Sequence, residues 1–215
     1  MSSTLGHLVS VNVGAPRTTI WQDREVESSI WKEPVAGPRR VEGVNVVGDD
    51  QANREVHGGE SKAVYAYSSA DAAWWAAELG RELSPGIFGE NLTVDGPDTA
   101  GAVVGERWRI GSVTLRVTEP RIPCSKLAMR FEDPAMTRRF ADAARPGTYL
   151  GIAEAGTLEA GDAIELLDRP DHGLTVSHIE RTYHRAADHL DAILACPDVS
   201  ETWLTWARRQ ADRKH

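Results

Sequence analysis

The segment PRIPCSKL at residues 120–127 combines residue types that thiol chemistry requires. Cys124 lies between two cations, Arg121 and Lys126. Because a neighbouring positive charge lowers the pKa of a thiol, this cysteine is predicted to favour its thiolate form, which attacks electrophiles and binds soft metals. A structural alternative stays open on the local sequence, since most cysteines outside disulfides are small, buried, apolar residues.

The residues around Cys124 predict that it is held at the end of a strand. Ser112 to Thr118 reads as a strand that leads into the segment. Pro120 and Pro123 disfavour both strand and helix, so we expect a fixed loop from Pro120 to Leu127.

A polar, glycine-containing segment at Gly48 to Lys62, GDDQANREVHGGESK, is the first candidate to join this thiol. It carries Arg54, His57 and the glycine pair that begins with Gly58. Glycine lets a ligand approach the backbone, and backbone N–H groups with cationic side chains can bind an anion. Taken alone, a histidine is more often structural and a glycine pair more often a turn.

A second such segment, GIFGENLT, runs from Gly86 to Thr93 and includes Glu90 and Asn91, which together offer an acceptor and a donor. If the three segments meet, they would form a pocket with a soft ligand, cations for a phosphate and amides for a heterocycle. Neither GxxxxGK[ST] nor GxGxxG is present, so a nucleoside triphosphate or a dinucleotide is not indicated. Zinc spacings such as CxxC or HExxH are also missing.

Length and composition indicate a globular chain with one domain of ordinary size and an appendage. The 215 residues are 41% hydrophobic and 26% charged, and the net charge is -8. An acidic chain is a poor general binder of polyanions. Two cysteines suit a reducing compartment, and no segment reads as a membrane span, so we expect a cytoplasmic protein with no membrane partner.

Short strands separated by Gly, Pro and Asp dominate the first two thirds of the chain and predict a mainly β fold, a barrel with inserted helices. Helices are predicted over Ser69 to Leu83, where Trp74 and Trp75 are expected to pack in the core, and over Pro134 to Ala144. The predicted strands are Leu8 to Val13, Val26 to Trp31, Val41 to Val46, Ala63 to Tyr67, Arg107 to Ile110, Ser112 to Thr118, Tyr149 to Ala153 and Ile164 to Leu167.

Three short amphipathic helices are predicted beyond His172, over Thr175 to Ala186, Asp188 to Ala195 and Ser200 to Arg213. We therefore divide the chain into a barrel domain, residues 1–170, and a small three-helix C-terminal domain, residues 171–215. A helix-turn-helix unit that binds DNA is an alternative, but His172 to His215 holds six Lys or Arg against six Asp or Glu, so no nucleic-acid partner is expected. The favoured reading is a cap packed on the barrel through Ile179, Tyr183, Leu190, Ile193, Trp203 and Leu204.

Taken in order, GDDQANREVHGG, GIFGENLT and EPRIPCSKL resemble the motifs of the MOSC domain, named for the C-terminal domain of molybdenum cofactor sulfurases. The tail segments LTVSHIERTYHR and SETWLTWARR resemble the three-helix domain of bacterial members that confer resistance to 6-hydroxylaminopurine. The resemblance covers nearly the whole chain. Asn53 departs from the pattern, which more often has Asp there, and this puts an acidic role at that position in doubt.

The resemblance implies a MOSC-type β-barrel, a molybdenum cofactor (molybdopterin with Mo) and reduction of N-hydroxylated small molecules. It implies that Cys124 is the molybdenum ligand. His57, Asn91 and Arg121 match motif positions that line the cofactor site. The residues expected to bind the cofactor are Cys124, Arg121, Lys126, Asn91, Glu90, Thr93, His57, Gly58 and Arg54. At the level of the family, the resemblance also implies pyridoxal phosphate binding.

Roles follow for four of these residues. Arg121 and Lys126 would offset the cofactor phosphate, and Asn91 would bond the pterin or the substrate. His57 would donate a proton. Because two cysteines cannot hold a four-cysteine iron–sulfur cluster, a separate flavin or iron–sulfur reductase is expected to supply electrons.

Three matters stay open in the sequence. A carrier that binds the molybdenum cofactor or sulfur without catalysis is one alternative function. A cysteine hydrolase that uses Cys124 with His57 is another. A homodimer is also left open.

Overall fold

The computed structural model describes residues 3–50, 59–185 and 189–213. Its centre is a seven-stranded β-barrel with the strand order β13-β9-β10-β11-β7-β8-β1, which closes where β1 pairs with β13. Strands β7 and β8 pair in parallel, and the other barrel pairings are antiparallel. The barrel strands are β1 (Ser3–Val13), β7 (Val64–Ser68), β8 (Leu92–Asp95), β9 (Arg107–Ile110), β10 (Val113–Pro120), β11 (Thr148–Glu154) and β13 (Ala163–Asp168).

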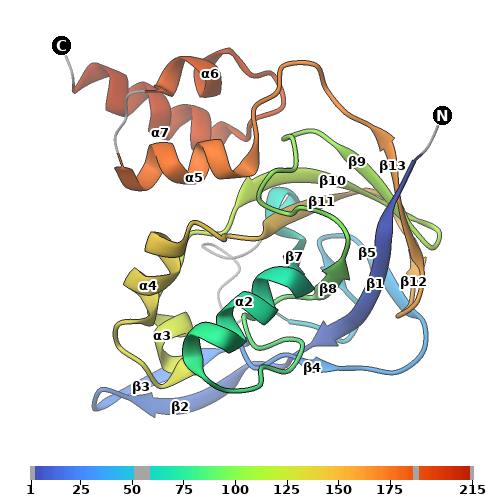
Figure 1. The fold of residues 1–215 in the computed structure, drawn as a ribbon, viewed down its shortest axis with the longest axis vertical. Coiled ribbons are helices and arrows are strands. Elements are labelled where there is room, and N and C mark those ends of the chain that lie inside the picture. Colours follow the sequence, from blue (N-terminus) through green and yellow to red (C-terminus); the bar gives the residue numbers. More distant parts are fainter. Residues whose placement is uncertain (1–2, 51–58, 186–188, 214–215) are drawn as a thin grey trace.

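Smaller elements surround one end of the barrel (Figure 1). The hairpin of β2 and β3 turns at Gln22 and Asp23, which both have positive φ angles of 51° and 59°, as the tight turn of a two-residue hairpin requires. The remaining strands are β2 (Arg17–Trp21), β3 (Arg24–Ser28), β4 (Glu33–Pro34), β5 (Arg39–Glu42), β6 (Asn45–Val46) and β12 (Gly156–Leu158). The short helices here are η1 (Glu60–Lys62), α2 (Ser69–Leu79), α3 (Ser125–Phe131) and α4 (Met136–Ala143).

Helix α2 begins at Ser69 as predicted, but it ends at Leu79, four residues before the predicted Leu83, because Gly80 ends it ahead of Pro85. Ser68 caps the first turn by accepting a hydrogen bond from the Ala70 N–H, and Gly80 ends the helix in the left-handed conformation. The predicted core role of the tryptophans holds fully for Trp75, which is 1% exposed, whereas Trp74 is partly buried.

Three C-terminal helices, α5 (Val176–Arg185), α6 (Leu190–Ala195) and α7 (Glu201–Asp212), stack on the other end of the barrel (Figure 1). The predicted packing residues Ile179, Leu190, Ile193 and Trp203 join one apolar cluster with the barrel core. Tyr183 differs from the prediction: it is 43% exposed and packs against the rings of the two tryptophans of α7. The division at residue 170 remains a prediction.

The sequence-based elements agree with the structure in type more often than in extent. The strand predicted over Val41 to Val46 is two short strands, β5 and β6, because Gly43 turns the chain between them with a φ of 62°. Helix α3 begins at Ser125, inside the stretch Pro120 to Leu127 that was expected to be a loop, because Pro123 does not prevent a helix from starting two residues later. No helix among the described residues has the length and apolar character needed to cross a membrane.

Gly105 packs closely against Pro170 and Asp198, where the barrel meets the C-terminal helices, and this contact can be tested. Its φ is 94°, and a Cβ atom there would lie 2.8 Å from Asp198 Cγ and 2.9 Å from Pro170 Cγ. We expect Gly105→Ala to lower the free energy of unfolding by about 1–3 kcal/mol more than the same substitution at a glycine whose surroundings are open. Gly161→Ala is the matched control, because its φ is 98° and nothing lies within 4 Å of its Cβ position.

Urea unfolding of both variants measures the difference. Equal losses of stability would mean that the contact of Gly105 with the helical unit contributes nothing beyond the backbone conformation.

Candidate functional site

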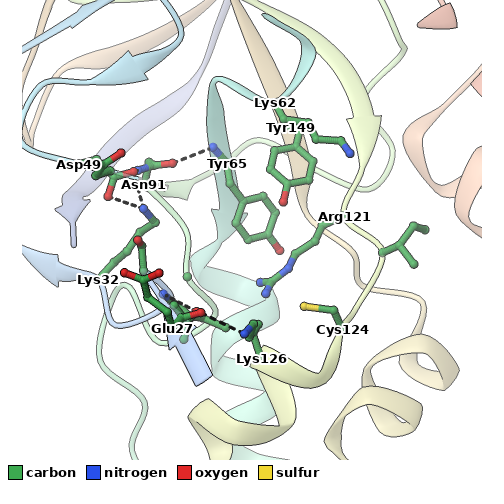
Figure 2. A pocket seen from close by; sticks show the side chains of 16 residues that line it. Glu27, Lys32, Asp49, Lys62, Tyr65, Asn91, Arg121, Cys124, Lys126 and Tyr149 are labelled. Carbon is green, nitrogen blue, oxygen red and sulfur yellow. Dashed lines mark hydrogen bonds and ion pairs between the residues drawn. The ribbon is translucent and has the colours of Figure 1, made fainter. Parts of the chain in front are cut away.

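A cavity of about 390 Å³ opens beside the barrel, and Cys124 lies on its wall (Figure 2). The lining comes from the β2–β3 hairpin and the chain after it, from the chain after β6, from η1 and the start of β7, and from the loop before β8. The connection from β10 to α3, the first turn of α3 and strand β11 complete it. Its residues are Glu27, Ser28, Ser29, Ile30, Lys32, Asp49, Asp50, Lys62, Tyr65, Gly89, Asn91, Arg121, Ile122, Cys124, Lys126 and Tyr149. The structure therefore brings the three segments expected from the sequence to one place.

Cys124 immediately precedes helix α3 and is partly exposed. Strand β10 continues through Pro120, and α3 begins at Ser125, so the expected loop from Pro120 to Leu127 is wrong in extent: four residues, 121–124, connect the two elements. The Cys124 carbonyl accepts hydrogen bonds from the Leu127 N–H at 3.0 Å and the Thr137 hydroxyl at 3.3 Å. These bonds hold the backbone that carries the thiol.

Arg121 is buried to 7% exposure beside the thiol. Its guanidinium donates to the Phe88 carbonyl and lies 5.0 Å from the centre of the Tyr65 ring, a cation–π contact. Burial opposes its charge, but the neighbouring Tyr65, Tyr149 and Cys124 hold the pKa of Arg121 above its ordinary value. Figure 2 shows this guanidinium next to the sulfur of Cys124.

Lys126 stands on the first turn of α3 and reaches the hairpin. Its ammonium donates to the Glu27 carbonyl at 3.0 Å. The two cations predicted to flank the thiol both line the cavity. Each also donates to a backbone carbonyl of a neighbouring segment, Phe88 for Arg121 and Glu27 for Lys126.

A buried ion pair forms another part of the wall. Lys32 and Asp49 are hydrogen-bonded to each other, with side-chain exposures of 8% and 1%. Asp49 also accepts from the Gly14 N–H at 2.8 Å and the Asn91 amide at 2.9 Å. Burial lowers the pKa of Lys32, and the nearby Asp49 opposes that shift.

Asn91 lines the cavity, but its amide is engaged with the protein. Its nitrogen donates to Asp49 and to the Asn12 carbonyl at 3.3 Å, and its oxygen accepts from the Tyr65 N–H at 3.1 Å. Asn91 thus joins β1, β7 and the chain at Asp49, and it acts on the cavity mainly by fixing that wall.

The match to a known family covers part of this lining. A model of the MOSC domain matches residues 53–165, more than half of the chain. The chain belongs to the MOSC domain family. The matched region includes Cys124 and the loop around Asn91 and ends before the C-terminal helices.

Two relatives of this MOSC protein match most of its length. The uncharacterized protein YflK of Bacillus subtilis is 32% identical over 209 residues, which are 96% of this chain and 95% of YflK. A protein of Gibberella moniliformis named "Reductase" is 31% identical over 184 residues, 84% of this chain but only 33% of that protein. The chain therefore spans a third of that reductase.

Solved structures agree with the fold. The crystal structure of YiiM from Geobacillus stearothermophilus superposes with a TM-score of 0.78 at 29% identity and covers 95% of this chain and 98% of that one. YiiM from Escherichia coli superposes with a TM-score of 0.73 at 23% identity, covering 86% and 90%.

Two residues expected to bind the cofactor lie behind the cavity wall of the MOSC barrel. Glu90 is 1% exposed, and its carboxylate accepts from the Gly86 and Phe88 N–H groups and from the Thr93 hydroxyl. Thr93 also accepts from the Asn12 amide. Neither lines the cavity; both shape the loop that places Gly89 and Asn91 on it. Arg54, His57 and Gly58 lie outside the described residues, so their assignments stay predictions.

Several lining residues escaped the sequence analysis. Lys32 follows a predicted strand in the unremarkable segment IWKEP, and Tyr65 and Tyr149 read as ordinary strand residues. Burial raises the pKa of both tyrosines, which keeps their hydroxyls neutral. Only the fold places these residues opposite the thiol.

A second group of potential ligands, His172, Cys196 and Asp198, lies where the helical unit meets the barrel, with its ligand atoms within 4.8 Å of one another. His172 Nδ1 accepts from the Leu174 N–H at 3.0 Å, so the proton of the neutral ring is on Nε2. That nitrogen faces Asp198 Oδ2 at 3.3 Å and Cys196 Sγ at 3.4 Å. A protonated nitrogen is not a metal ligand, and the group acts as a hydrogen-bonded connection.

The Lys32–Asp49 pair yields a stability prediction. In Asp49→Asn the Lys32 ammonium loses its charge partner while buried, so we expect a loss of about 3–5 kcal/mol. Glu33→Gln, which breaks the exposed pair with Arg17, is the control and should cost less than about 1 kcal/mol. Chemical denaturation measures both.

The stability loss in Asp49→Asn should depend on pH. In the folded protein the pKa of Lys32 lies below its ordinary value of 10.5. Between the folded pKa and 10.5 the unfolded state therefore binds more protons than the folded state, and stability rises with pH. The loss in Asp49→Asn should therefore shrink as pH is raised toward 10.5. A loss that is independent of pH would contradict the burial of an uncompensated charge.

Proposed function

We propose that this MOSC protein is a molybdenum-cofactor-dependent reductase of N-hydroxylated compounds, such as hydroxylaminopurines, amidoximes and hydroxylamines. The observation that carries the proposal is the Cys124 thiol on the wall of the cavity, beside the guanidinium of Arg121. Thiolate is a soft ligand that suits a metal whose remaining ligands arrive with a cofactor.

The described lining fits such a group. A cavity of about 390 Å³ has the size of a small-molecule site. Ser29 lines it and is 9% exposed, yet its buried hydroxyl oxygen has no hydrogen-bond partner among the described residues, so a bound polar group would complete it. At Gly89, with a φ of 76°, a Cβ atom would lie 3.0 Å from Ile30 Cγ1, and glycine keeps this part of the wall open.

Charge also favours an anionic ligand. The described lining carries four cations and three carboxylates. The Lys32–Asp49 pair neutralises one of each, which leaves three cations against two carboxylates. Arg121 and Lys126 lie nearest the thiol along the chain and are the candidates to offset a cofactor phosphate. The cations are Lys32, Lys62, Arg121 and Lys126, and the carboxylates are Glu27, Asp49 and Asp50.

The bound cofactor would supply the two-electron chemistry that removes oxygen from an N–OH group. The reaction consumes two electrons and two protons and releases water as the hydroxylamine becomes the amine. Cys124 would hold the metal, and Tyr65 and Tyr149 would exclude water with their rings. His57 remains the proposed proton donor. Electrons would come from a separate flavin or iron–sulfur reductase, and the relative named "Reductase" supports oxidoreductase chemistry.

The test is to express the protein in cells that make the cofactor and to measure molybdenum by elemental analysis. Cys124→Ser should lose molybdenum and, with a reductase present, lose turnover of an N-hydroxylated purine by at least about 100-fold, because the metal ligand is removed. Cys196→Ser, which removes the other thiol far along the chain, should retain both.

Each other outcome has a defined meaning. Equal turnover by Cys124→Ser would overturn the ligand assignment. Stoichiometric molybdenum without reduction of any N–OH compound would instead favour a cofactor carrier. Ester cleavage that needs no metal and is abolished by alkylation would favour a cysteine hydrolase.

A further inference from the structure

Glu119 is a fully buried carboxylate that lies between the cavity and the C-terminal helices. It is the next-to-last residue of β10 and is 0% exposed. A buried carboxylate must be paired or hydrogen-bonded to stay ionised. Its partners therefore indicate what its charge is used for.

On one side, Glu119 contacts the cavity wall. Its Oε1 atom lies 3.7 Å from the Lys62 ammonium and accepts from the Ser61 hydroxyl at 3.3 Å. Lys62 lines the cavity, and its side chain is 27% exposed. The Glu119 carboxylate thus restrains the Lys62 ammonium, which also lines the cavity.

On the other side, Glu119 contacts the start of α7. Its Oε2 atom accepts from the Ser200 hydroxyl at 3.1 Å, and the Trp203 side chain of the same helix helps to lower the pKa of the carboxyl. Ser200 is the N-cap residue of α7, where its carbonyl accepts from the Trp203 and Leu204 N–H groups at 3.0 Å. The position of the hydroxyl is therefore fixed by the helix.

We infer that Glu119 is a positioning residue that holds Lys62 at the cavity, and that the C-terminal helices support it through the Ser200 hydroxyl. The helical unit then stabilises the cavity wall through Glu119 and does more than cover the barrel. That Lys62 faces the anionic part of a cofactor rests on the proposed function; the link from Ser200 to Lys62 does not.

The energetics agree with this arrangement. Burial raises the pKa of Glu119, while Lys62 and the hydroxyl and indole donors lower it. Removal of the Ser200 donor leaves the carboxylate less stabilised in its charged form. The attraction between Glu119 and Lys62 then weakens, although no residue that lines the cavity has been substituted.

Site-resolved acylation of cofactor-free protein tests the link. The protein is treated with a low dose of acetic anhydride, and the acetylated fractions of Lys62 and Lys126 are compared by mass spectrometry in one digest. Because an ion pair stabilises the unreactive ammonium, Glu119→Gln should increase the Lys62 to Lys126 ratio by about threefold. Ser200→Ala should change it in the same direction by a smaller factor.

Two variants separate a positioning role from general loosening. Ser200→Thr keeps the hydroxyl and should restore the ratio. Thr205→Ala removes a hydroxyl of α7 that, among the described residues, hydrogen-bonds to Glu201 alone, and should leave the ratio unchanged. An unchanged ratio in both Glu119→Gln and Ser200→Ala would overturn the inference.

The same variants distinguish this inference from the proposed function. If acylation responds as expected while molybdenum never binds, the link stands and the function fails. If molybdenum binds and N-hydroxy compounds are reduced but acylation does not respond, the function stands and the link fails. Should Glu119→Gln fail to fold, Ser200→Ala and its threonine counterpart give the same decision.

Discussion

Compensation of buried charge is the constraint on which the cavity depends. Lys32, Arg121 and Glu119 are each no more than 7% exposed, and removing ions from water costs several kcal/mol apiece unless partners replace the lost hydration. Each partner comes from a different element: Asp49 for Lys32, the Phe88 carbonyl for Arg121, and Ser200 for Glu119. The charges therefore lock together segments far apart in the sequence, and the cavity lies where these segments meet.

This arrangement explains why some residues that were expected to bind the cofactor instead stabilise the cavity wall. Asn91 and Glu90 lie in the loop that the sequence singled out, but their polar groups satisfy buried backbone and side-chain partners. A satisfied group is unlike Ser29, whose hydroxyl lacks a protein partner among the described residues. The loop contributes to the site by holding other residues in place, which is the usual work of polar residues one layer behind a binding surface.

The sequence predicted the strands and helices by type and identified Cys124, but it did not predict the residues that lie across the cavity from the thiol. Gly and Pro punctuation located most barrel strands, and two flanking cations drew attention to Cys124. Tyr65 and Tyr149 were not predicted because a residue's side of a strand, and its neighbour across a closed barrel, depend on register and closure. Lys32 was not predicted because it lies in the connection between β3 and β4, whose path over the cavity is set by the tertiary fold. Helix α3 was missed because Pro123 ends the preceding segment without preventing a helix two residues later.

The pairing of β1 with β13 joins nearly the first and nearly the last residues of the barrel, with Ser3 opposite Leu166. Contacts between such distant residues slow folding, because a long loop must close before they contribute stability. During synthesis the barrel cannot close until residues 163–168 have left the ribosome, and until then β1 presents an unpaired edge. The chain must pass through translation with that edge exposed, so chaperone binding to nascent β1 would protect it from aggregation.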